Sequence, residues 1–244
     1  MNARRNALLR LLAVQGSWNY ERMLGVGMGY AAEPLLEDLA ISDPARHAEA
    51  SVRSAEFFNS HPYLAGLALG ASVRAEYDGV PGAQVARLRT ALCSPLGALG
   101  DQLFWAGLLP GMLGLTITAV ALGAGWWPVA LFLVAYNIVR GYVAVWALRT
   151  GLDAGMHVGA AINATRLPAL VGMVGAPAAF LVGAAAAPAA RWLLGPVDAV
   201  TASSAIVIAA VGIALGRLAG PRFAAPKFAL IALGATLLIR SVTG

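Results

Sequence analysis

The sequence is poor in charge, in cysteine and in histidine. Only 12% of its 244 residues are charged and 59% are hydrophobic, whereas about a quarter of the residues in a soluble domain are charged. An ordinary water-soluble domain is therefore excluded. The single cysteine, Cys93, excludes an internal disulfide and removes any demand for an oxidising compartment. The three histidines, His47, His61 and His157, are too dispersed to predict a metal site.

Sequence motifs for common enzyme classes are also missing. The chain has no phosphate-cradling G-x-x-x-x-G-K-[ST] string and no H-E-x-x-H string. Its glycine-rich strings at 25–29 and 155–159 follow no predicted strand, so a dinucleotide site is unsupported. The formal charge is +5, but the basic residues are scattered singly and no cluster is interleaved with aromatics. We expect no catalytic residue, no cofactor, no metal and no nucleic-acid partner.

The few charges are distributed unevenly along the chain. Residues 1–101 hold nine basic and ten acidic residues, a net charge of −1, while residues 102–244 hold eight basic and two acidic residues, a net charge of +6. This division predicts a cytoplasmic, partly membrane-embedded helical region over 1–101 and a transmembrane region over 102–244. The apolar run in residues 1–14 is too short for a cleaved signal peptide, and we expect an amphipathic helix on the cytoplasmic membrane face.

Long uncharged stretches predict about five membrane segments. A spanning helix needs roughly 20 apolar residues, and the uncharged run from Gln102 to Val139 is broken by the turn Gly123–Pro128. The expected spans are 102–124, 126–148, 167–190, about 197–216 and a shorter 223–240. Basic residues accumulate in cytoplasmic loops. The arginines and lysine of 149–166 and 217–227 therefore place these loops, and the N-terminal region, inside.

The N-terminal region reads as a series of helices. Asp43 and Pro44 predict a helix start, and this helix is expected to end before His61-Pro62. Its features are an apolar stripe (Ala45, Ala48, Val52 and Ala55) and a Glu49–Arg53 pair. The uncharged segment 62–73 is too short to cross the hydrocarbon, which predicts a re-entrant or interfacial element before the chain returns to water at 74–79. A basic amphipathic helix over 83–92 and an irregular segment over 94–100 should follow. The fold class is therefore all-α: a polytopic membrane protein with an N-terminal amphipathic and re-entrant helical region.

The candidate binding residues stand at the entrance to the longest uncharged run. Asp101 lies beside Gln102 and Trp105, and a carboxylate, an amide and an indole together can accept sugar hydroxyls and cover the flat face of a sugar ring. The alternative is that Asp101 only caps a membrane helix. Asn59 and His61 stand where one helix closes and a membrane-depth segment opens, an arrangement that binds substrate in many transporters. Here the alternative is helix capping.

Other polar residues are candidates for structure or assembly. Asn19, Glu21 and Arg22 lie in an aromatic and polar cluster, for which the alternative is an interfacial aromatic belt with exposed charges. Asn137 and Arg140 lie one helical turn apart inside the second span, where a charge normally faces the protein interior or water. Snorkelling of Arg140 to the interface is the alternative. Two glycine strings, at Gly97 and Gly100 and at Gly107, Gly111 and Gly114, favour close helix packing.

Three blocks carry a resemblance to a known family. They are 16–23 (GSWNYERM), 56–63 (EFFNSHPY) and 97–105 (GALGDQLFW). In this order they resemble the IID subunit of the mannose/fructose/sorbose family of the phosphoenolpyruvate-dependent sugar phosphotransferase system, from about Gln15 to Arg140.

The resemblance implies a function and a set of partners. It implies a membrane subunit that translocates a hexose-type sugar together with a IIC subunit, in a larger IIC–IID oligomer of the bacterial cytoplasmic (inner) membrane. Soluble IIA and IIB components would relay phosphate to the sugar, and IID would carry no phospho-accepting residue, so it would not be an enzyme by itself.

Two departures from the family pattern keep a second hypothesis open. Leu109 precedes Pro110 where the family usually has an Arg-Pro pair, and the C-terminal half is shorter and richer in alanine than expected. The alternative function is a non-transporting membrane scaffold or sensor in an incomplete, regulatory phosphotransferase system.

Overall fold

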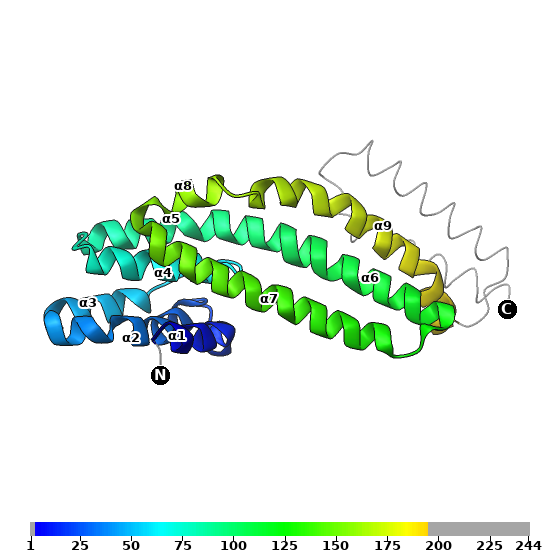
Figure 1. Ribbon diagram of the computed structural model, residues 1–244, viewed down its shortest axis with the longest axis horizontal. Helices are drawn as coiled ribbons and strands as arrows, with labels where there is room; N and C mark the ends of the chain where they lie inside the picture. The colour runs from blue at the N-terminus through cyan, green and yellow to red at the C-terminus, as the bar shows by residue number, and fades with distance from the viewer. Residues whose placement is uncertain (1–2, 195–244) are drawn as a thin grey trace. The chain divides into compact units, whose positions relative to one another are not determined.

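The computed structural model describes residues 3–194, in which every regular element is a helix (Figure 1). This confirms the all-α fold class. The chain divides into two compact units, Met1–Ala186 and Ala187–Gly244, and the first holds nearly all of the described residues. In chain order the elements are α1 (Ala3–Leu12), η1 (Val14–Ser17), α2 (Gly25–Ser42), α3 (Pro44–Ser54), α4 (Ala65–Tyr77), α5 (Gly82–Gly100), η2 (Asp101–Leu108), α6 (Leu109–Ala119), η3 (Val120–Ala124), α7 (Trp127–Ala154), η4 (Gly155–His157), α8 (Val158–Asn163) and α9 (Leu167–Leu194).

Helix α2 packs against both α1 and α3. The expected N-terminal helix is present as α1. It buries Ala7 and Leu11 and packs on α2. The start of α3 is as the sequence predicts: Asp43 Oδ1 accepts a hydrogen bond from the Arg46 backbone N–H at 3.0 Å, and Pro44 is the first helical residue.

Helix α3 ends at Ser54, before His61-Pro62 as the sequence predicts. Its apolar stripe, however, does not face the bundle: Ala45 and Ala48 are exposed and Val52 is 69% exposed. The buried face instead carries Ala50 and Ser54. The helix is turned this way because its arginines reach inward.

Those arginines surround a buried acid on α4. Glu76 is 3% exposed, and its carboxylate accepts from Arg53 Nε at 2.8 Å and lies 3.0 Å from Arg46 Nη2. A buried carboxylate needs such partners, since an unpaired charge is strongly destabilising. The predicted Glu49–Arg53 pair is therefore wrong, and the segment 74–79 does not simply return to water.

Helix α4 lies at the centre of the bundle. Eleven of its thirteen residues are buried, and it packs chiefly on α7. The two helices approach closely through glycines: a Cβ on Gly66 or Gly70 would meet the backbone of α7, and one on Gly151 would meet the Leu67 carbonyl oxygen. The segment predicted to be re-entrant or interfacial is therefore enclosed by protein, and its depth in a membrane stays a prediction.

One continuous helical rod runs from Gly82 to Ala124, as Figure 1 shows. Residues 94–100 are helical although they include Pro95, so the predicted irregular segment is wrong. The buried residues of α5 are Val85, Arg89, Leu92, Leu96 and Gly100. Their spacing of three to four residues is that of one helix face, and this packing overrides the breaker residues. Residues 101–108 adopt the wider π-helical turn, which often occurs at functional sites.

The turn that joins the first two spans is where the sequence predicts it. Gly123 and Gly125 adopt φ of 91° and 73°, a conformation that glycine allows, and α7 begins at Trp127. α7 then runs to Ala154, and α8 follows, so most of the expected loop 149–166 is helical. α9 confirms a helix over 167–190. The predicted spans 197–216 and 223–240 lie outside the described residues.

Glycines also hold α9 against the first span. A Cβ on Gly107, Gly111 or Gly114 would press on Val174, Ala178 or Leu181 respectively, which confirms the predicted close packing at this string.

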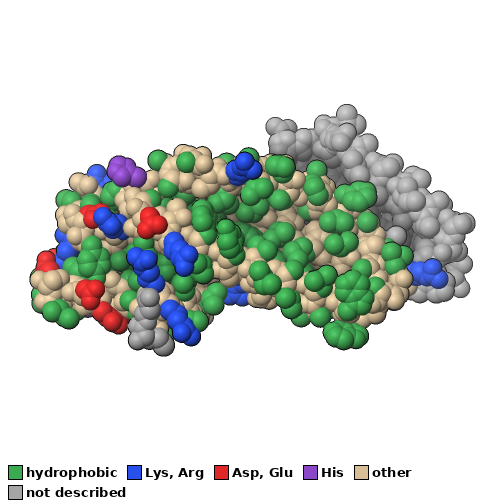
Figure 2. Space-filling view, in the orientation of Figure 1, with side chains coloured by type: hydrophobic (Ala, Val, Ile, Leu, Met, Phe, Trp, Pro, Cys, Tyr) green, Lys and Arg blue, Asp and Glu red, His purple; other side chains and the backbone are tan. Residues whose placement is uncertain are grey.

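Three helices among the described residues are long and apolar enough to cross a membrane: Gly82–Ala124, Trp127–Asn163 and Leu167–Ala186. On the face in Figure 2, charged side chains gather over the N-terminal helices while hydrophobic side chains cover α6 and α7.

Candidate functional site

Backbone pairing joins the first two sequence blocks. The Leu24 N–H donates to the Phe58 carbonyl at 2.9 Å, and the Phe58 N–H donates to the Arg22 carbonyl at 3.2 Å. The contact is tight at the start of α2, where a Cβ on Gly25 would meet the Glu56 carbonyl oxygen. Blocks that are separated by more than thirty residues thus form one surface.

Asn19 builds the loop of the first block. Its Oδ1 accepts from the backbone N–H groups of Glu21 and Arg22, at 3.1 and 2.9 Å, and its Nδ2 donates to the Ser17 carbonyl at 3.2 Å. This is the local turn that asparagine side chains favour. Glu21 and Arg22 are exposed, and within the described residues their side chains form no hydrogen bond or ion pair with Asn59 or Asp101.

The three blocks together line a cleft of about 670 Å³, a size typical of small-molecule sites. Asn59, Asp101 and Trp105, predicted from the sequence, meet there. Gln102 and His61 do not line the cleft. Its lining residues are Gln15, Trp18, Leu24, Phe57, Asn59, Ser60, Pro62, Cys93, Ser94, Gly97, Ala98, Asp101 and Trp105.

Asp101 is not at a helix N-terminus. α5 runs directly into it, and its backbone N–H donates to carbonyls of the preceding turn. Within residues 3–194 its carboxylate makes no hydrogen bond or ion pair, and neither does the Asn59 side chain. The alternative of a simple helix cap is therefore wrong, and the carboxylate is free to accept hydrogen bonds from a ligand.

His61 lies behind the wall of the cleft. Its side chain is 1% exposed, and its ring stacks on Phe104 with centroids 5.0 Å apart. Nδ1 accepts from the Tyr63 backbone N–H at 3.3 Å, while Nε2 is buried without a partner in the described residues. Burial lowers the pKa of His61 from 6.5 to about 4, so the ring is neutral at physiological pH.

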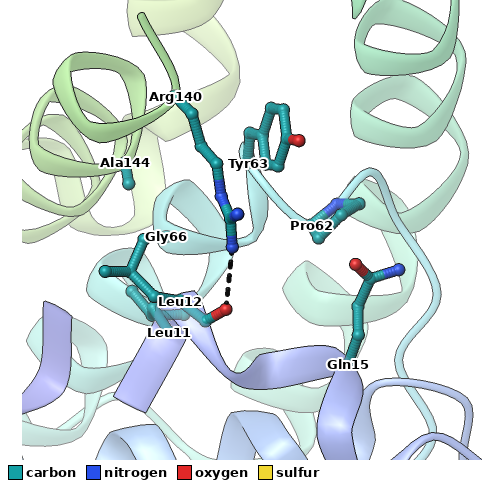
Figure 3. A pocket seen from close by; sticks show the side chains of 8 residues that line it. All are labelled: Leu11, Leu12, Gln15, Pro62, Tyr63, Gly66, Arg140 and Ala144. Carbon is teal, nitrogen blue, oxygen red and sulfur yellow. Dashed lines mark hydrogen bonds between the residues drawn. The ribbon is translucent and has the colours of Figure 1, made fainter. Parts of the chain in front are cut away.

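Arg140 finds its partners within the chain. Figure 3 shows it reaching from α7 past Tyr63 to the last turn of α1, where Nη2 donates to the Leu12 carbonyl at 3.0 Å. Its guanidinium also lies 5.4 Å from the centre of the Tyr63 ring, within the range of a cation–π contact. The cavity beside it holds only about 10 Å³, room for about one water molecule.

Asn137, one turn away, points elsewhere. Its side chain is exposed, and its Nδ2 donates to the Leu133 carbonyl of its own helix at 2.8 Å. Its exposed neighbours on α7 include Val134 and Ile138. Asn137 and Arg140 therefore do not share a partner.

Sequence reasoning did not select several cleft residues. Gln15, Cys93 and Ser94 line the cleft, but none belongs to a recognisable motif. The signal that could have selected Gln15 is its position directly before the first block, 16–23.

The helices and the three spans define a membrane protein, and sequence comparison defines its family. Residues 1–218 match the family model of the mannose/fructose/sorbose IID component of the phosphotransferase system. The chain belongs to this IID family.

Named relatives agree with the family match. The chain is 28% identical over 159 residues to the mannose-specific EIID component of Escherichia coli K12, covering 63% of this chain and 56% of the relative. It is 28% identical over 148 residues to the fructose permease IID component of Bacillus subtilis, covering 59% and 53%. The chain thus spans just over half the length of the curated relatives that it matches.

Solved structures share the fold. A structure described as a membrane protein aligns with a TM-score of 0.64 at 26% identity, covering 75% of this chain and 68% of that one. A chain of the mannose transporter ManYZ in complex with microcin E492 aligns with a TM-score of 0.58 at 24% identity, with the same coverage.

Proposed function

We propose that this chain is the IID membrane subunit of a phosphotransferase-system permease that translocates a hexose-type sugar across the bacterial cytoplasmic membrane. The observation that carries the proposal is the cleft in which the uncommitted Asp101 carboxylate lies beside Asn59 and Trp105. Asp101 and Asn59 accept hydrogen bonds from sugar hydroxyls, and the indoles of Trp105 and Trp18 cover apolar faces of the ring.

The partners follow from the family. A IIC subunit completes the sugar path, and ManYZ, whose chain shares this fold, supports a two-subunit permease. IIC and IID assemble further into a larger oligomer, soluble IIA and IIB components supply phosphate, and this chain transfers none itself. The Bacillus subtilis relative is described as a fructose permease IID component, which favours transport over a regulatory scaffold.

The polar residues suggest that the subunit works only in this complex. The side-chain oxygen Oδ1 of the exposed Asn137 on α7 accepts no hydrogen bond within the described residues. An unpaired polar group at membrane depth costs roughly 1–3 kcal/mol of free energy. A IIC helix on this face of α7 would supply the missing donor. Purification of this chain alone as a stable, sugar-binding protein would contradict the need for IIC.

The single cysteine offers a direct test of the cleft. Cys93 lines it and is partly accessible. In membranes that contain the chain and its IIC partner, the rate at which N-ethylmaleimide alkylates Cys93 is measured with mannose, fructose or sorbose, and with glycerol as control. The sugar that the complex takes up should slow alkylation severalfold, and a Cys93→Ser variant identifies the labelled band. A transported sugar that leaves the rate unchanged would place the sugar site outside this cleft.

A further inference from the structure

The environment of His61 is aromatic on three sides. Its ring stacks on Phe104 at 24° between planes, meets Trp105 with centroids 4.8 Å apart and meets Tyr63 edge-on with centroids 4.7 Å apart. On a fourth side it lies against Gly100, where a Cβ would collide with the His61 Cβ. The imidazole therefore fills the space between the 59–62 connector and the helix that carries Asp101.

Of these neighbours, Trp105 is the one that lines the cleft. It is 48% exposed, and on its covered side its ring packs against the His61 ring, with centroids 4.8 Å apart and 57° between the planes. A half-exposed side chain keeps one orientation only if its covered side is packed, and His61 provides this contact.

We infer that His61 is a positioning residue: its ring fixes the Trp105 indole as the apolar wall of the sugar cleft, without touching the sugar itself. That this wall binds sugar rests on the proposed function of the cleft. That His61 fixes the position of the Trp105 ring does not depend on it. The buried, unpartnered Nε2 fits this role, because a sugar ligand would need that atom to reach the cleft.

The imidazole does two separable things. Its ring packs on aromatic neighbours, and its Nδ1 accepts the Tyr63 N–H ahead of α4. Asparagine places an acceptor near the position of Nδ1 but has no ring, whereas phenylalanine keeps the ring and loses the acceptor. His61→Asn and His61→Phe are therefore a matched pair, and His61→Gln places an amide near the position of Nε2.

The first measurement needs no sugar. The protein is labelled with 5-fluorotryptophan in complex with IIC, and the Trp105 fluorine signal is assigned with Trp105→Phe. His61→Phe should leave this signal as a single sharp line, whereas His61→Asn should shift and broaden it. An unmoved signal in His61→Asn would overturn the inference, whether or not the complex binds sugar.

The second measurement is the dissociation constant for the transported sugar among mannose, fructose and sorbose. His61→Phe should stay within about threefold of the unsubstituted protein, and His61→Asn should bind about tenfold more weakly, the scale of an aromatic pair. Retention of affinity by His61→Gln, with loss in His61→Phe, would show that His61 is a sugar ligand and would overturn the positioning role. If the unsubstituted complex takes up none of these sugars, the proposed function fails while the fluorine signal still decides the positioning of Trp105.

Discussion

Asp101 lines the cleft, and within residues 3–194 its carboxylate makes no hydrogen bond or ion pair. We expect Asp101→Asn to keep the size of the side chain and the assembly of the complex but to weaken sugar affinity about tenfold. The reason is that hydrogen bonds to a charged group contribute roughly 1.5–3 kcal/mol against about 1 kcal/mol for neutral ones. Radiolabelled sugar uptake and binding in membrane vesicles measure the effect.

Two companion variants locate the contact more closely. Asn59→Ala should also impair binding with little effect on membrane insertion, because Asn59 faces the same cleft. Gln102→Ala should have little effect, since Gln102 is next to Asp101 in sequence but outside the cleft lining. Normal uptake in both Asp101→Asn and Asn59→Ala, with the complex intact, would place the sugar contacts on the partner subunit.

The buried imidazole of His61 predicts a pH effect on stability. In the folded chain its pKa is lowered to about 4, whereas in the unfolded chain it is near 6.5. Between these values the unfolded state binds the proton and the folded state does not, so stability falls as the pH drops from 6.5 towards 4. His61→Phe should lack this contribution. Its melting temperature should therefore fall less between pH 7.5 and pH 5 than that of the unsubstituted protein, and equal falls would show that His61 titrates normally when folded.

Among elements, the crossing of α4 and α7 leaves no room for an added side chain at its glycines. A Cβ on Gly151 would meet the Leu67 carbonyl oxygen, whereas one on Gly141, in the same helix, would meet nothing within 4 Å. Gly151→Ala should destabilise the protein by about 1–3 kcal/mol, the typical range for overpacking. Gly141→Ala should be neutral or slightly stabilising, because alanine is the better helix former. Thermal unfolding of the two variants, each purified in complex with IIC, makes the comparison. A Gly151→Ala variant as stable as Gly141→Ala and the unsubstituted protein would show that the two helices can separate without cost.

The elements also show which features a sequence can predict. The helices of the first three predicted spans and the turn at Gly123–Gly125 were predictable because a long apolar run and a glycine-rich break are local signals. The orientation of α3 was not, because it depends on Glu76, which lies more than twenty residues away and draws Arg46 and Arg53 inward.

The candidate site divides in the same way. Asp101, Asn59 and Trp105 were predictable as residue types within recognisable blocks. Their convergence was not, because it depends on the pairing of Met23 with Phe58 and on the continuity of α5 through Pro95. The place of His61 behind the wall likewise follows only from its packing on Gly100 and Phe104.

For the whole molecule, the distribution of basic residues predicts the orientation in the membrane. A reporter fused after Ala124, at the turn between the first two spans, should lie outside the cell, and one fused after Pro221 should lie inside. The reason is that loops rich in arginine and lysine stay in the cytoplasm. Alkaline phosphatase and green fluorescent protein fusions at each position report the two sides. A cytoplasmic signal after Ala124 would invert the first two spans and remove the basis for a cytoplasmic N-terminal region.

The π-helical turn at 101–108 has a consequence for insertions and deletions. Each residue of an α-helix advances about 100° around the axis, so removal of one residue from α5 would rotate everything beyond it and turn the Gly111 and Gly114 face away from α9. A π-helical turn contains one residue more than an α-helical turn. Loss of one residue inside 101–108 would therefore restore α-helical geometry and leave the helical phase on both sides unchanged. Such a deletion would keep the packing of the span on α9, but it would move Asp101 and Trp105 relative to each other and so change the wall of the cleft.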